Sequence, residues 1–168
     1  MTRKLLIYPD RRLRQKSVEV AEFNADLHAL LDDMREAMLE HAGVGLAAIQ
    51  IGEPVRAFII NIPDDEGNQT KETLLEFINP KIVESEGEIL YNEGCLSVPE
   101  FTEEVARFES VVIEYSDRDG VRQKREAHGL LSIAIQHEYD HLEGRLFLER
   151  LPMLKRKKFE KEWKKLAK

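Results

Sequence analysis

The sequence offers little from which a disulfide-bonded or membrane-bound protein could be built. Cys95 is its only cysteine, so no disulfide can form within the chain, and a reducing compartment is indicated. No apolar run approaches the roughly 18 residues that a membrane-spanning helix requires. The apolar run at residues 5–8 is followed by no small-residue cleavage site, so a secretory signal is not predicted. These absences predict a soluble cytoplasmic protein that has no membrane partner.

Positive charge is scarce except at the C-terminal end. The chain has 25 Lys and Arg against 32 Asp and Glu, a net charge of -7, which argues against sequence-specific nucleic-acid binding. Residues 155–168 hold eight Lys or Arg and two Glu, a local charge of +6. Pro152 suits the first turn of a helix, so a basic C-terminal helix is predicted over about 152–168. Its lysines would form either a solvated face or a contact with an acidic or nucleic-acid surface.

Length and composition predict one globular domain over residues 1–168. The chain is 42% hydrophobic and 34% charged, and its 168 residues are enough to bury a core. Neither an internal repeat nor a glycine-rich loop placed after a strand is present, so repeat architectures and phosphate-binding loops are not indicated.

Hydrophobic spacing predicts a helix, several strands and a second helix, in that order. From Asn24 to Ala42 apolar residues recur at spacings of three and four, with Asn24 as the N-cap and Gly43 as the stop. A later helix begins near Ser132 and ends at Gly144. Between the helices we expect extended runs at 55–61, 74–79, 81–90 and 105–115, with an interruption at Pro80 and a hairpin turn at Asp119-Gly120.

This order of elements predicts an α+β fold. Short strands joined by tight turns favour antiparallel sheets, and the two helices and the basic tail complete the pattern. We therefore expect mostly antiparallel sheets around a central helix at about 132–144, with a further helix at the C-terminus.

The later helix carries the pattern H-E-x-x-H. His137 and His141 are four residues apart and so lie on one helix face, where both imidazoles can reach a single ion. Glu138 lies about 100° around the helix, beside such an ion rather than on it. The pattern has only three fixed positions, so by itself it is equally compatible with a polar helix face.

Two histidines need a third ligand, and Cys95 is the best candidate. Position 147, where a third histidine of some zinc peptidases would stand, is Phe147, and no histidine follows His141. Cys95 lies in a segment bounded by Gly and Pro, and a thiolate binds divalent transition metals strongly. A lone cysteine taken alone is more often a small buried apolar residue. Acidic residues that follow the motif, Glu143, Glu149, Glu160 and Glu162, have no supporting pattern.

Three segments together resemble the motifs of the bacterial peptide deformylases, in the same order and with similar spacing. They are GVGLAAIQ at 43–50, EGCLS at 93–97 and QHEYDH at 136–141. The likeness extends over nearly the whole chain, including YPDRRLR at 8–14. The resemblance implies removal of the formyl group from the N-terminal formyl-methionine of newly made polypeptides, with release of formate.

The resemblance also implies a role for individual residues. Cys95, His137 and His141 correspond to the three metal ligands, and Glu138 to the general acid/base. A metal-bound hydroxide would attack the formyl carbon. The side chain of Gln50 and the backbone N–H of Leu96 would stabilise the oxyanion.

Further positions match residues of the family that bind substrate. Val44 and Gly45 would bind the peptide backbone, and Leu130, Ile133 and Ala134 would line the methionine pocket. The family implies Fe²⁺ in the cell, with Zn²⁺, Ni²⁺ or Co²⁺ in purified protein. A thiolate and two imidazoles suit several of these metals, so affinity alone does not choose among them.

The sequence departs from the family pattern at two positions. Ile49 replaces a common Pro or Thr in the first motif, which changes the stiffness of the loop. Thr102 stands where some relatives carry an arginine near the peptide portion of the substrate. The family pattern also suggests that Arg107 pairs with Glu93 and holds the Cys95 segment.

Nascent formyl-methionyl polypeptides are the expected partners, and the basic C-terminal helix is a candidate ribosome contact, led by residues 155–158. The chief alternative is a zinc peptidase that acts on internal peptide bonds. A binding module that has lost activity would be expected to lack a ligand or the base, whereas Cys95, Glu138 and both histidines are present. A closed structural zinc site needs four protein ligands, and only three are found.

Overall fold

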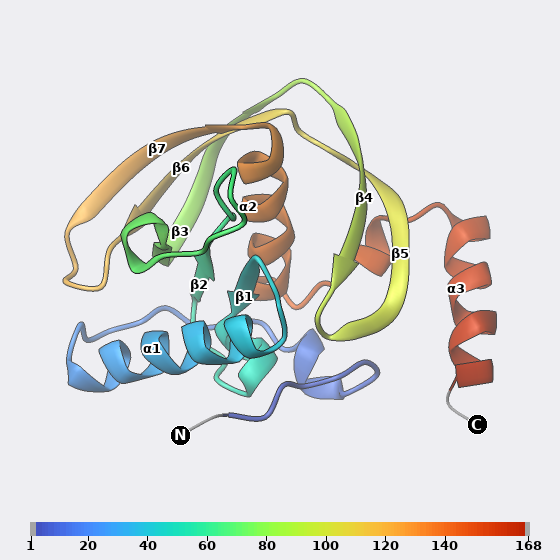
Figure 1. Cartoon of the computed structure of the whole chain (residues 1–168), viewed down its shortest axis with the longest axis horizontal. Helices are drawn as coiled ribbons and strands as arrows, with labels where there is room; N and C mark the ends of the chain where they lie inside the picture. The colour runs from blue at the N-terminus through green and yellow to red at the C-terminus, as the bar shows by residue number, and fades with distance from the viewer. Residues whose placement is uncertain (1–2, 167–168) are drawn as a thin grey trace.

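The computed structural model describes residues 3–166, which form two antiparallel sheets and three α-helices (Figure 1). The larger sheet has the strand order β1-β2-β3-β6-β7, and β4 pairs with β5 in a separate ribbon. The predicted α+β class with antiparallel sheets is confirmed. The helices are α1 (Ala25–Glu40), α2 (Gly129–Leu142) and α3 (Met153–Leu166). The strands are β1 (Gly45–Ala47), β2 (Ala57–Ile60), β3 (Leu75–Glu86), β4 (Ile89–Cys95), β5 (Val98–Arg107), β6 (Ser110–Ser116) and β7 (Arg122–His128), and the short 3-10 helices are η1 (Arg11–Arg14), η2 (Ala48–Ile51), η3 (Lys71–Thr73) and η4 (Phe147–Arg150).

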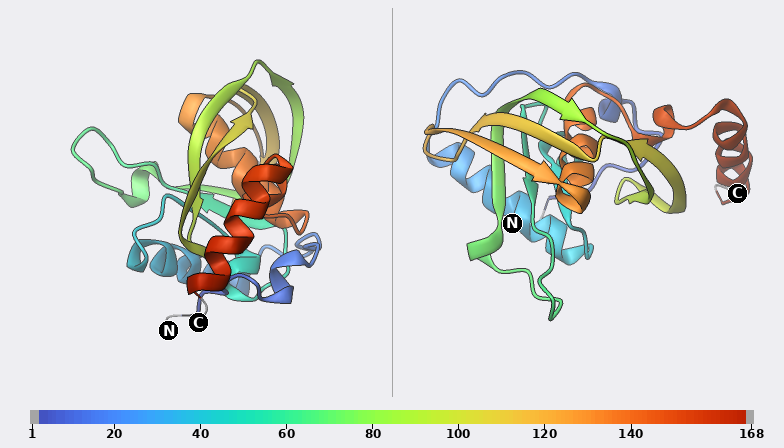
Figure 2. Two further views of the ribbon diagram at one scale, coloured as in Figure 1. Left: turned by 90° about the vertical axis from the view of Figure 1, so that its right-hand side faces the viewer. Right: turned by 90° about the horizontal axis from the view of Figure 1, so that it is seen from above.

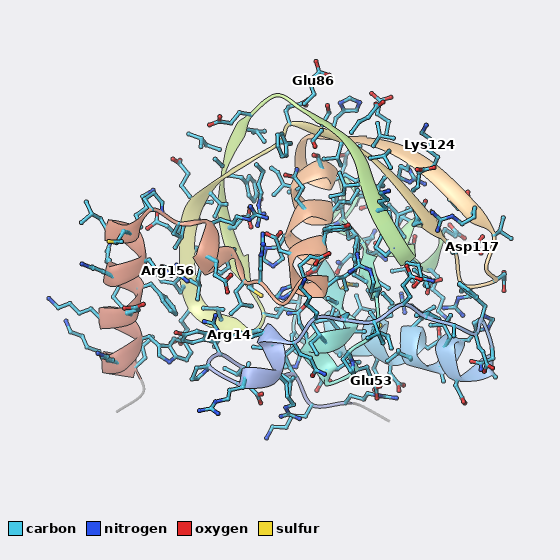
Figure 3. All side chains as sticks on the ribbon, turned by 180° about the vertical axis from the view of Figure 1, so that it is seen from behind. Arg14, Glu53, Glu86, Asp117, Lys124 and Arg156 are labelled. Atoms are coloured by element: carbon cyan, nitrogen blue, oxygen red, sulfur yellow. The ribbon has the colours of Figure 1, made fainter. Side chains whose placement is uncertain are left out.

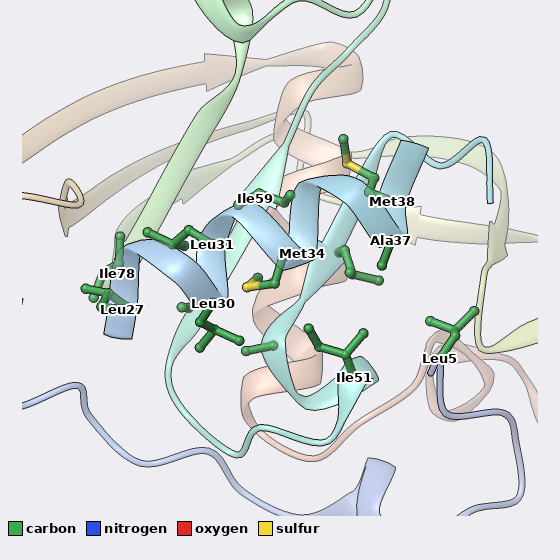
Figure 4. Close-up of a cluster of buried hydrophobic side chains, with 13 residues drawn as sticks. Leu5, Leu27, Leu30, Leu31, Met34, Ala37, Met38, Ile51, Ile59 and Ile78 are labelled. Atoms are coloured by element: carbon green, nitrogen blue, oxygen red, sulfur yellow. The ribbon is translucent and has the colours of Figure 1, made fainter. Parts of the chain in front are cut away.

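The helix α1 covers one face of the larger sheet with the apolar stripe that the sequence predicts. The side chain of Asn24 accepts a hydrogen bond from the backbone nitrogen of Leu27 (3.1 Å) and so caps the helix. Leu31 and Met34, one turn apart, are completely buried in the cluster shown in Figure 4. Burial of such a side chain is worth roughly 1.5–3 kcal/mol. Leu31→Ala would therefore destabilise the fold by about 2–5 kcal/mol, since it also leaves a cavity.

The strand β2 is buried on both faces, because α1 and α2 cover opposite sides of the sheet. Ala57 and Ile59 belong to the cluster under α1, whereas Phe58 and Ile60 belong to the cluster under α2. Successive side chains of a strand point to opposite faces of the sheet, and here the side chains on both faces are apolar. The sheet is thus the middle layer of the molecule, and it fixes α2 in place (Figure 1).

Pro80 does not end a strand, contrary to the sequence prediction. The strand β3 continues through it from Leu75 to Glu86, with a shift in register between Ile78 and Lys81. At this bulge Asn79 has a φ of 49°, and its side chain bonds both the N–H and the C=O of Val20 (2.8 and 3.0 Å). Proline is tolerated at a bulge because no ladder hydrogen bond is required from its nitrogen.

The extended run predicted at 105–115 is divided between two strands. Residues 105–107 end β5 in the ribbon, and Ser110 begins β6 in the larger sheet. Apolar residues recur across the boundary, at Val105, Phe108 and Val111, so the pattern carries no sign of the change of sheet. The predicted turn at Asp119-Gly120 is confirmed, since Gly120 has a φ of 83° between β6 and β7.

The helix α2 lies between the larger sheet and the β4–β5 ribbon (Figures 1 and 2). It begins at Gly129, three residues before the predicted Ser132, because Gly129 with a φ of 56° lets the chain pass directly from β7 into the helix. Its predicted end is confirmed at Gly144, where φ is 74° and a Cβ atom would overlap the backbone carbonyl of Arg14.

The helix α3 stands at the end of the molecule, outside the ribbon (Figure 2). It begins directly after Pro152, and the last two residues of the predicted range, 167 and 168, lie outside the described part. Phe159, which is 1% exposed, anchors α3 through edge contacts with Phe101 and Tyr8 (ring centroids 4.5 and 5.3 Å apart). Among the helices of residues 3–166, none has the length and apolar character to cross a membrane.

Candidate active site

The structure brings Cys95, His137 and His141 together. Cys95 ends β4, and the two histidines are one turn apart on α2. One potential ligand atom from each lies within 4.8 Å of the others, and Sγ of Cys95 is 3.5 Å from Nε2 of His141. Within residues 3–166 no other set of Cys, His, Asp or Glu side chains converges in this way. The fold thus unites the cysteine with the histidine pair across 42 positions of sequence.

The chemistry of these three side chains fits a divalent transition metal. The ring of His141 is fully buried, and its Nδ1 has no hydrogen-bond partner. Burial, reinforced by the charge of His137, lowers the pKa of His141 to about 3. The imidazole is therefore neutral at pH 7, which is the form that binds a metal. A thiolate and two imidazoles leave a fourth tetrahedral position open, as catalytic sites do.

Glu93 and Arg107 hold His137 in its orientation. Nδ1 of His137 lies 2.9 Å from Oε1 of Glu93, so the hydrogen bond at Nδ1 leaves Nε2 for Cys95 and an ion. Arg107 donates two hydrogen bonds to the same carboxylate, at 2.7 and 2.8 Å, which confirms the predicted pair. Burial raises the pKa of Glu93, but the hydrogen bonds from Arg107 and His137 outweigh it and bring that pKa to about 2.

Glu138 lies beside the ligand cluster. Its Oε1 is 4.0 Å from Nε2 of His137 and 3.9 Å from Nε2 of His141, and its Oε2 is buried without a hydrogen-bond partner. Burial raises the pKa of Glu138 to about 7. A carboxyl group with a pKa near neutrality can both accept and return a proton at pH 7.

Gln50 is fixed beside Cys95. Its Oε1 accepts a hydrogen bond from the backbone nitrogen of Ala47 (2.9 Å), so its amide nitrogen must face away from η2. That nitrogen donates to the hydroxyl of Ser97 (3.0 Å) and lies 3.6 Å from Sγ of Cys95. Gln50 is 1% exposed, so its donor group is held rigidly next to the ligand cluster.

A cavity of about 600 Å³ opens onto this cluster. Leu96 lines it in the turn after Cys95, and a Cβ atom on Gly43 would come within 2.6 Å of the Leu96 side chain, so Gly43 allows this close approach. The volume is suited to one or two amino-acid residues of a substrate. All five residues predicted to bind substrate line the cavity: Val44, Gly45, Leu130, Ile133 and Ala134.

Several residues that line or support the site were not predicted to do so from the sequence. Tyr91 and Phe101 line the cavity from β4 and β5, and Thr102, named as a departure from the family pattern, lies beside them. Asp140 accepts a hydrogen bond from Arg107 (2.7 Å) and two from Arg150 (3.0 and 2.6 Å). The alternation of β4 could have pointed to Tyr91, two residues before Glu93 on the same face.

Comparisons with known proteins agree with this geometry. The model of the polypeptide deformylase family matches residues 2–157. A peptide deformylase from Wolinella succinogenes is 55% identical over 161 residues, which cover 96% of this chain and 95% of that protein. The crystal structure of a peptide deformylase from Legionella pneumophila has a TM-score of 0.89 and 39% identity, covering 99% of this chain and 98% of that one.

A further solved structure carries a peptide. The class I type b peptide deformylase from Acinetobacter baumannii, with Met-Ala-Ser bound, has a TM-score of 0.83 and 30% identity, covering 90% of this chain and 99% of that one. The match over almost the whole length, together with the converging Cys95, His137 and His141, confirms the family resemblance. The chain belongs to the polypeptide deformylase family and is a metal-dependent hydrolase.

Proposed function

We propose that this chain, acting in the cytoplasm as one catalytic domain, removes the formyl group from the N-terminal formyl-methionine of newly made polypeptides and releases formate. The observation that carries the proposal is the position of Glu138. Its carboxylate lies about 4 Å from the Nε2 atoms of His137 and His141, and it faces a cavity large enough for a methionine residue.

Cys95, His137 and His141 would hold one divalent ion. When bound, that ion would supply activated water at neutral pH and draw electron density from the formyl oxygen. We propose Fe²⁺ in the cell, with Zn²⁺, Ni²⁺ or Co²⁺ able to occupy the same donors in purified protein, since thiolate and imidazole suit all of them.

Glu138 would move the proton that hydrolysis requires. Its ionised carboxylate accepts a proton from the attacking water as the new C–O bond forms. The same group then donates that proton to the nitrogen of methionine as the C–N bond breaks, which leaves a free amine and formic acid, and the acid ionises to formate at neutral pH. The raised pKa of Glu138, about 7, suits both halves of this cycle.

Gln50 and Leu96 would stabilise the negative charge that develops on the formyl oxygen. The Gln50 amide nitrogen is fixed beside Cys95, and the backbone N–H of Leu96 follows Cys95 directly. Each preorganised donor of this kind is worth about 10²–10³ in rate.

The methionine side chain would bind beside α2. Leu130, Ile133, Ala134 and His137 recur at helical spacings of three and four, so they share the helix face that lines the cavity. Ile133 and Ala134 are buried and would form the wall of the pocket, whereas Leu130 is half-exposed at its rim. Val44 lies just before β1 and Gly45 begins it. Because β1 is an edge strand, the backbone groups of this segment that are not bonded to the neighbouring β2 segment would pair with an extended peptide.

The first experiment measures formate release from formyl-Met-Ala-Ser by protein purified without oxygen, with Fe, Zn, Ni and Co determined on the same sample. We expect near one metal per chain and rapid release. Glu138→Ala should retain the metal and lose the activity. Cleavage of unformylated peptides, with no formate produced, would instead support the zinc peptidase.

We also propose that α3 contacts the ribosome. Lys157, Lys161 and Lys164 are exposed at spacings of four and three, and so share one face of the helix, while Phe159 anchors the opposite face. Figure 3 shows side chains of α3, Arg156 among them, at the end of the molecule far from Lys124 of β7. A lysine face of this kind would bind phosphate groups of ribosomal RNA.

Charge reversal tests the ribosome contact without removing Phe159 from the core. The variant in which Lys157, Lys161 and Lys164 are replaced by Glu should lose co-sedimentation with ribosomes, and wild-type binding should weaken steeply as salt is raised. Lys124→Glu, at the opposite end, is the matched control. Equal co-sedimentation of both variants would refute the contact.

A further inference from the structure

Arg150 is connected to the ligand cluster through a continuous chain of charged contacts. It donates to both oxygens of Asp140, from Nε to Oδ2 (3.0 Å) and from Nη2 to Oδ1 (2.6 Å). Asp140 also accepts from Nη1 of Arg107 (2.7 Å). Arg107 in turn holds Glu93 with two hydrogen bonds, and Glu93 bonds Nδ1 of His137. Four contacts therefore lead from Arg150 to a candidate metal ligand.

The charges of this network balance only when Arg150 is included. The side chains of Glu93, Arg107 and Asp140 are 3%, 2% and 7% exposed, so all three are withdrawn from water. Two carboxylates face the single guanidinium of Arg107, and Arg150 supplies the second positive charge. Removal of one partner of a buried ion pair strongly destabilises the fold, because the remaining charge is left uncompensated unless it forms another contact. Without Arg150, Asp140 would compete with Glu93 for Arg107.

A second cavity borders this network on the side away from the substrate. It measures about 440 Å³ and is lined by Arg107, Asp140 and Arg150, none of which lines the cavity at Glu138. Water in it can approach Asp140 from the side away from the substrate. The two parallel hydrogen bonds from Arg150 occupy both carboxylate oxygens and so exclude water from them.

The packing of η4 holds Arg150 in place. Phe147 and Leu148 of η4 are buried, as is Leu151 after it, in the cluster beneath the ribbon. The ring of Phe147 lies 6.1 Å from that of His137, between centroids. The same short helix therefore packs against the histidine ring and presents the arginine that completes the charge network.

We propose that Arg150 is a positioning residue for His137. Arg150 occupies both carboxylate oxygens of Asp140, so Arg107 keeps its two hydrogen bonds to Glu93. Glu93 in turn holds the His137 ring with Nε2 toward Cys95 and the ion. The inference rests on the proposed metal centre. It adds a residue that touches neither the substrate nor the ligands, yet sets how firmly the metal is held.

The test measures metal retention directly, without an activity assay. Wild type, Arg150→Ala and Arg150→Lys are loaded with Co²⁺, and the rate at which a chelator removes the metal is recorded together with the visible absorption spectrum. Loss of a partner that orients a metal-binding histidine costs about 10- to 100-fold in affinity. We expect Arg150→Ala to release Co²⁺ at least about tenfold faster, with an altered spectrum.

Arg150→Lys should give an intermediate rate, because lysine restores the charge but cannot form two parallel hydrogen bonds. Arg14→Ala is the matched control: Arg14, labelled in Figure 3, pairs with Glu149 next to Arg150 (3.2 Å) and is 56% exposed. We expect this variant to release metal at the wild-type rate. If Arg150→Ala does not fold, Arg150→Gln, which keeps a polar side chain but removes the charge and the paired donors, is measured in its place and should also release metal faster.

The outcomes separate this inference from the proposed function. Wild-type protein that binds no Co²⁺ would overturn the metal centre itself and, with it, any role of Arg150 there. Firm binding by wild type, with the same release rate and spectrum in Arg150→Ala or Arg150→Gln, would leave the metal centre intact and overturn the positioning role. A lower melting temperature alone, without a change in release rate, would show that Arg150 only stabilises the fold.

Discussion

Gly45 and Glu138 are in direct contact. A Cβ atom on Gly45 would lie 3.1 Å from Oε2, 3.2 Å from Cδ and 3.3 Å from Cγ of Glu138, so an added methyl group must displace the carboxylate. We expect Gly45→Ala to retain its metal and to lower kcat by about ten- to a hundredfold, because small displacements of a catalytic group are costly. Steady-state kinetics on formyl-Met-Ala-Ser, with metal content determined on the same preparation, measure this. An unchanged kcat would mean that Glu138 does not act from the position seen here.

Glu138 should also set a pH dependence of stability in the metal-free protein. Its pKa is raised by burial to about 7 in the folded state, against an ordinary 4.5. Between these values the folded state binds more protons than the unfolded state, so this group's contribution falls as pH rises from about 4.5 to 7, by roughly 2–4 kcal/mol. Glu138→Gln removes that penalty. Urea unfolding of both metal-free proteins should show a stability advantage of the variant that grows over this range.

Wild type and Glu138→Gln must be compared with each other, because titration of His141 changes stability with pH in the opposite direction to titration of Glu138. Its lowered pKa, about 3, makes stability rise with pH up to about 6.5, and this contribution is common to both proteins. The difference between wild type and Glu138→Gln therefore cancels the contribution of His141 and leaves that of the carboxylate together with its interaction with His137, whose pKa Glu138 helps to raise. A constant difference from pH 4.5 to 7 would contradict the raised pKa of Glu138.

The elements that follow local rules could be predicted from the sequence. Asn24 caps α1, and the apolar stripe behind it is buried, because capping and periodicity depend on residues a few positions apart. The pairing of His137 with His141 follows in the same way from one turn of helix. Their union with Cys95 depends on how the β4–β5 ribbon lies against α2. Ligand chemistry made Cys95 the best candidate for a third ligand, and the likeness to a known family made this choice specific.

The parts of the fold that were predicted wrongly from the sequence depend on tertiary contacts. Pro80 continues a strand because the side chain of Asn79 bonds the backbone of Val20, 59 positions away. The division of residues 105–115 between two sheets leaves no trace in the alternation of apolar residues. Arg150 joins the site through Asp140, and nothing in the local sequence distinguishes it from a solvated arginine.

Gln50→Ala should impair catalysis much more than substrate binding. The amide nitrogen at Gln50 is one of two proposed donors to the oxyanion, and loss of such a donor costs about 10²–10³ in kcat. Truncation also leaves the backbone N–H of Ala47 without its present partner, which should lower stability by about 1–3 kcal/mol. Kinetics and chemical unfolding measure the two effects separately. A raised KM with normal kcat would assign Gln50 to substrate binding instead.

Arg107→Ala should lower both stability and metal content. It leaves the buried carboxylates of Glu93 and Asp140 without their shared partner, and breaking a buried ion pair costs about 3–5 kcal/mol. The control is Arg118→Ala: Arg118 also bridges two acids, Asp32 and Glu76, but is 30% exposed. Since this guanidinium is partly exposed to water and lies away from the ligand cluster, the control should lose less stability than Arg107→Ala and keep its metal. Normal metal content and melting temperature in Arg107→Ala would remove this residue from the support of the site.

Ala134→Phe should change which first residue is accepted. Ala134 is 8% exposed and lines the cavity one turn before His137, so a larger side chain there would fill the space proposed for methionine. One methylene in an apolar pocket is worth about 1–3 kcal/mol, or roughly 10–200-fold in kcat/KM, and a phenyl ring is much larger, so the loss should reach at least the upper end of this range. We expect that loss for formyl-Met-Ala-Ser and a much smaller one for formyl-Ala-Ala-Ser, because alanine needs little of the pocket. Metal content should be unchanged, since Ala134 contributes no ligand atom. An equal loss for both peptides would show that the variant perturbs the reacting centre and would place the methionine side chain elsewhere in the cavity.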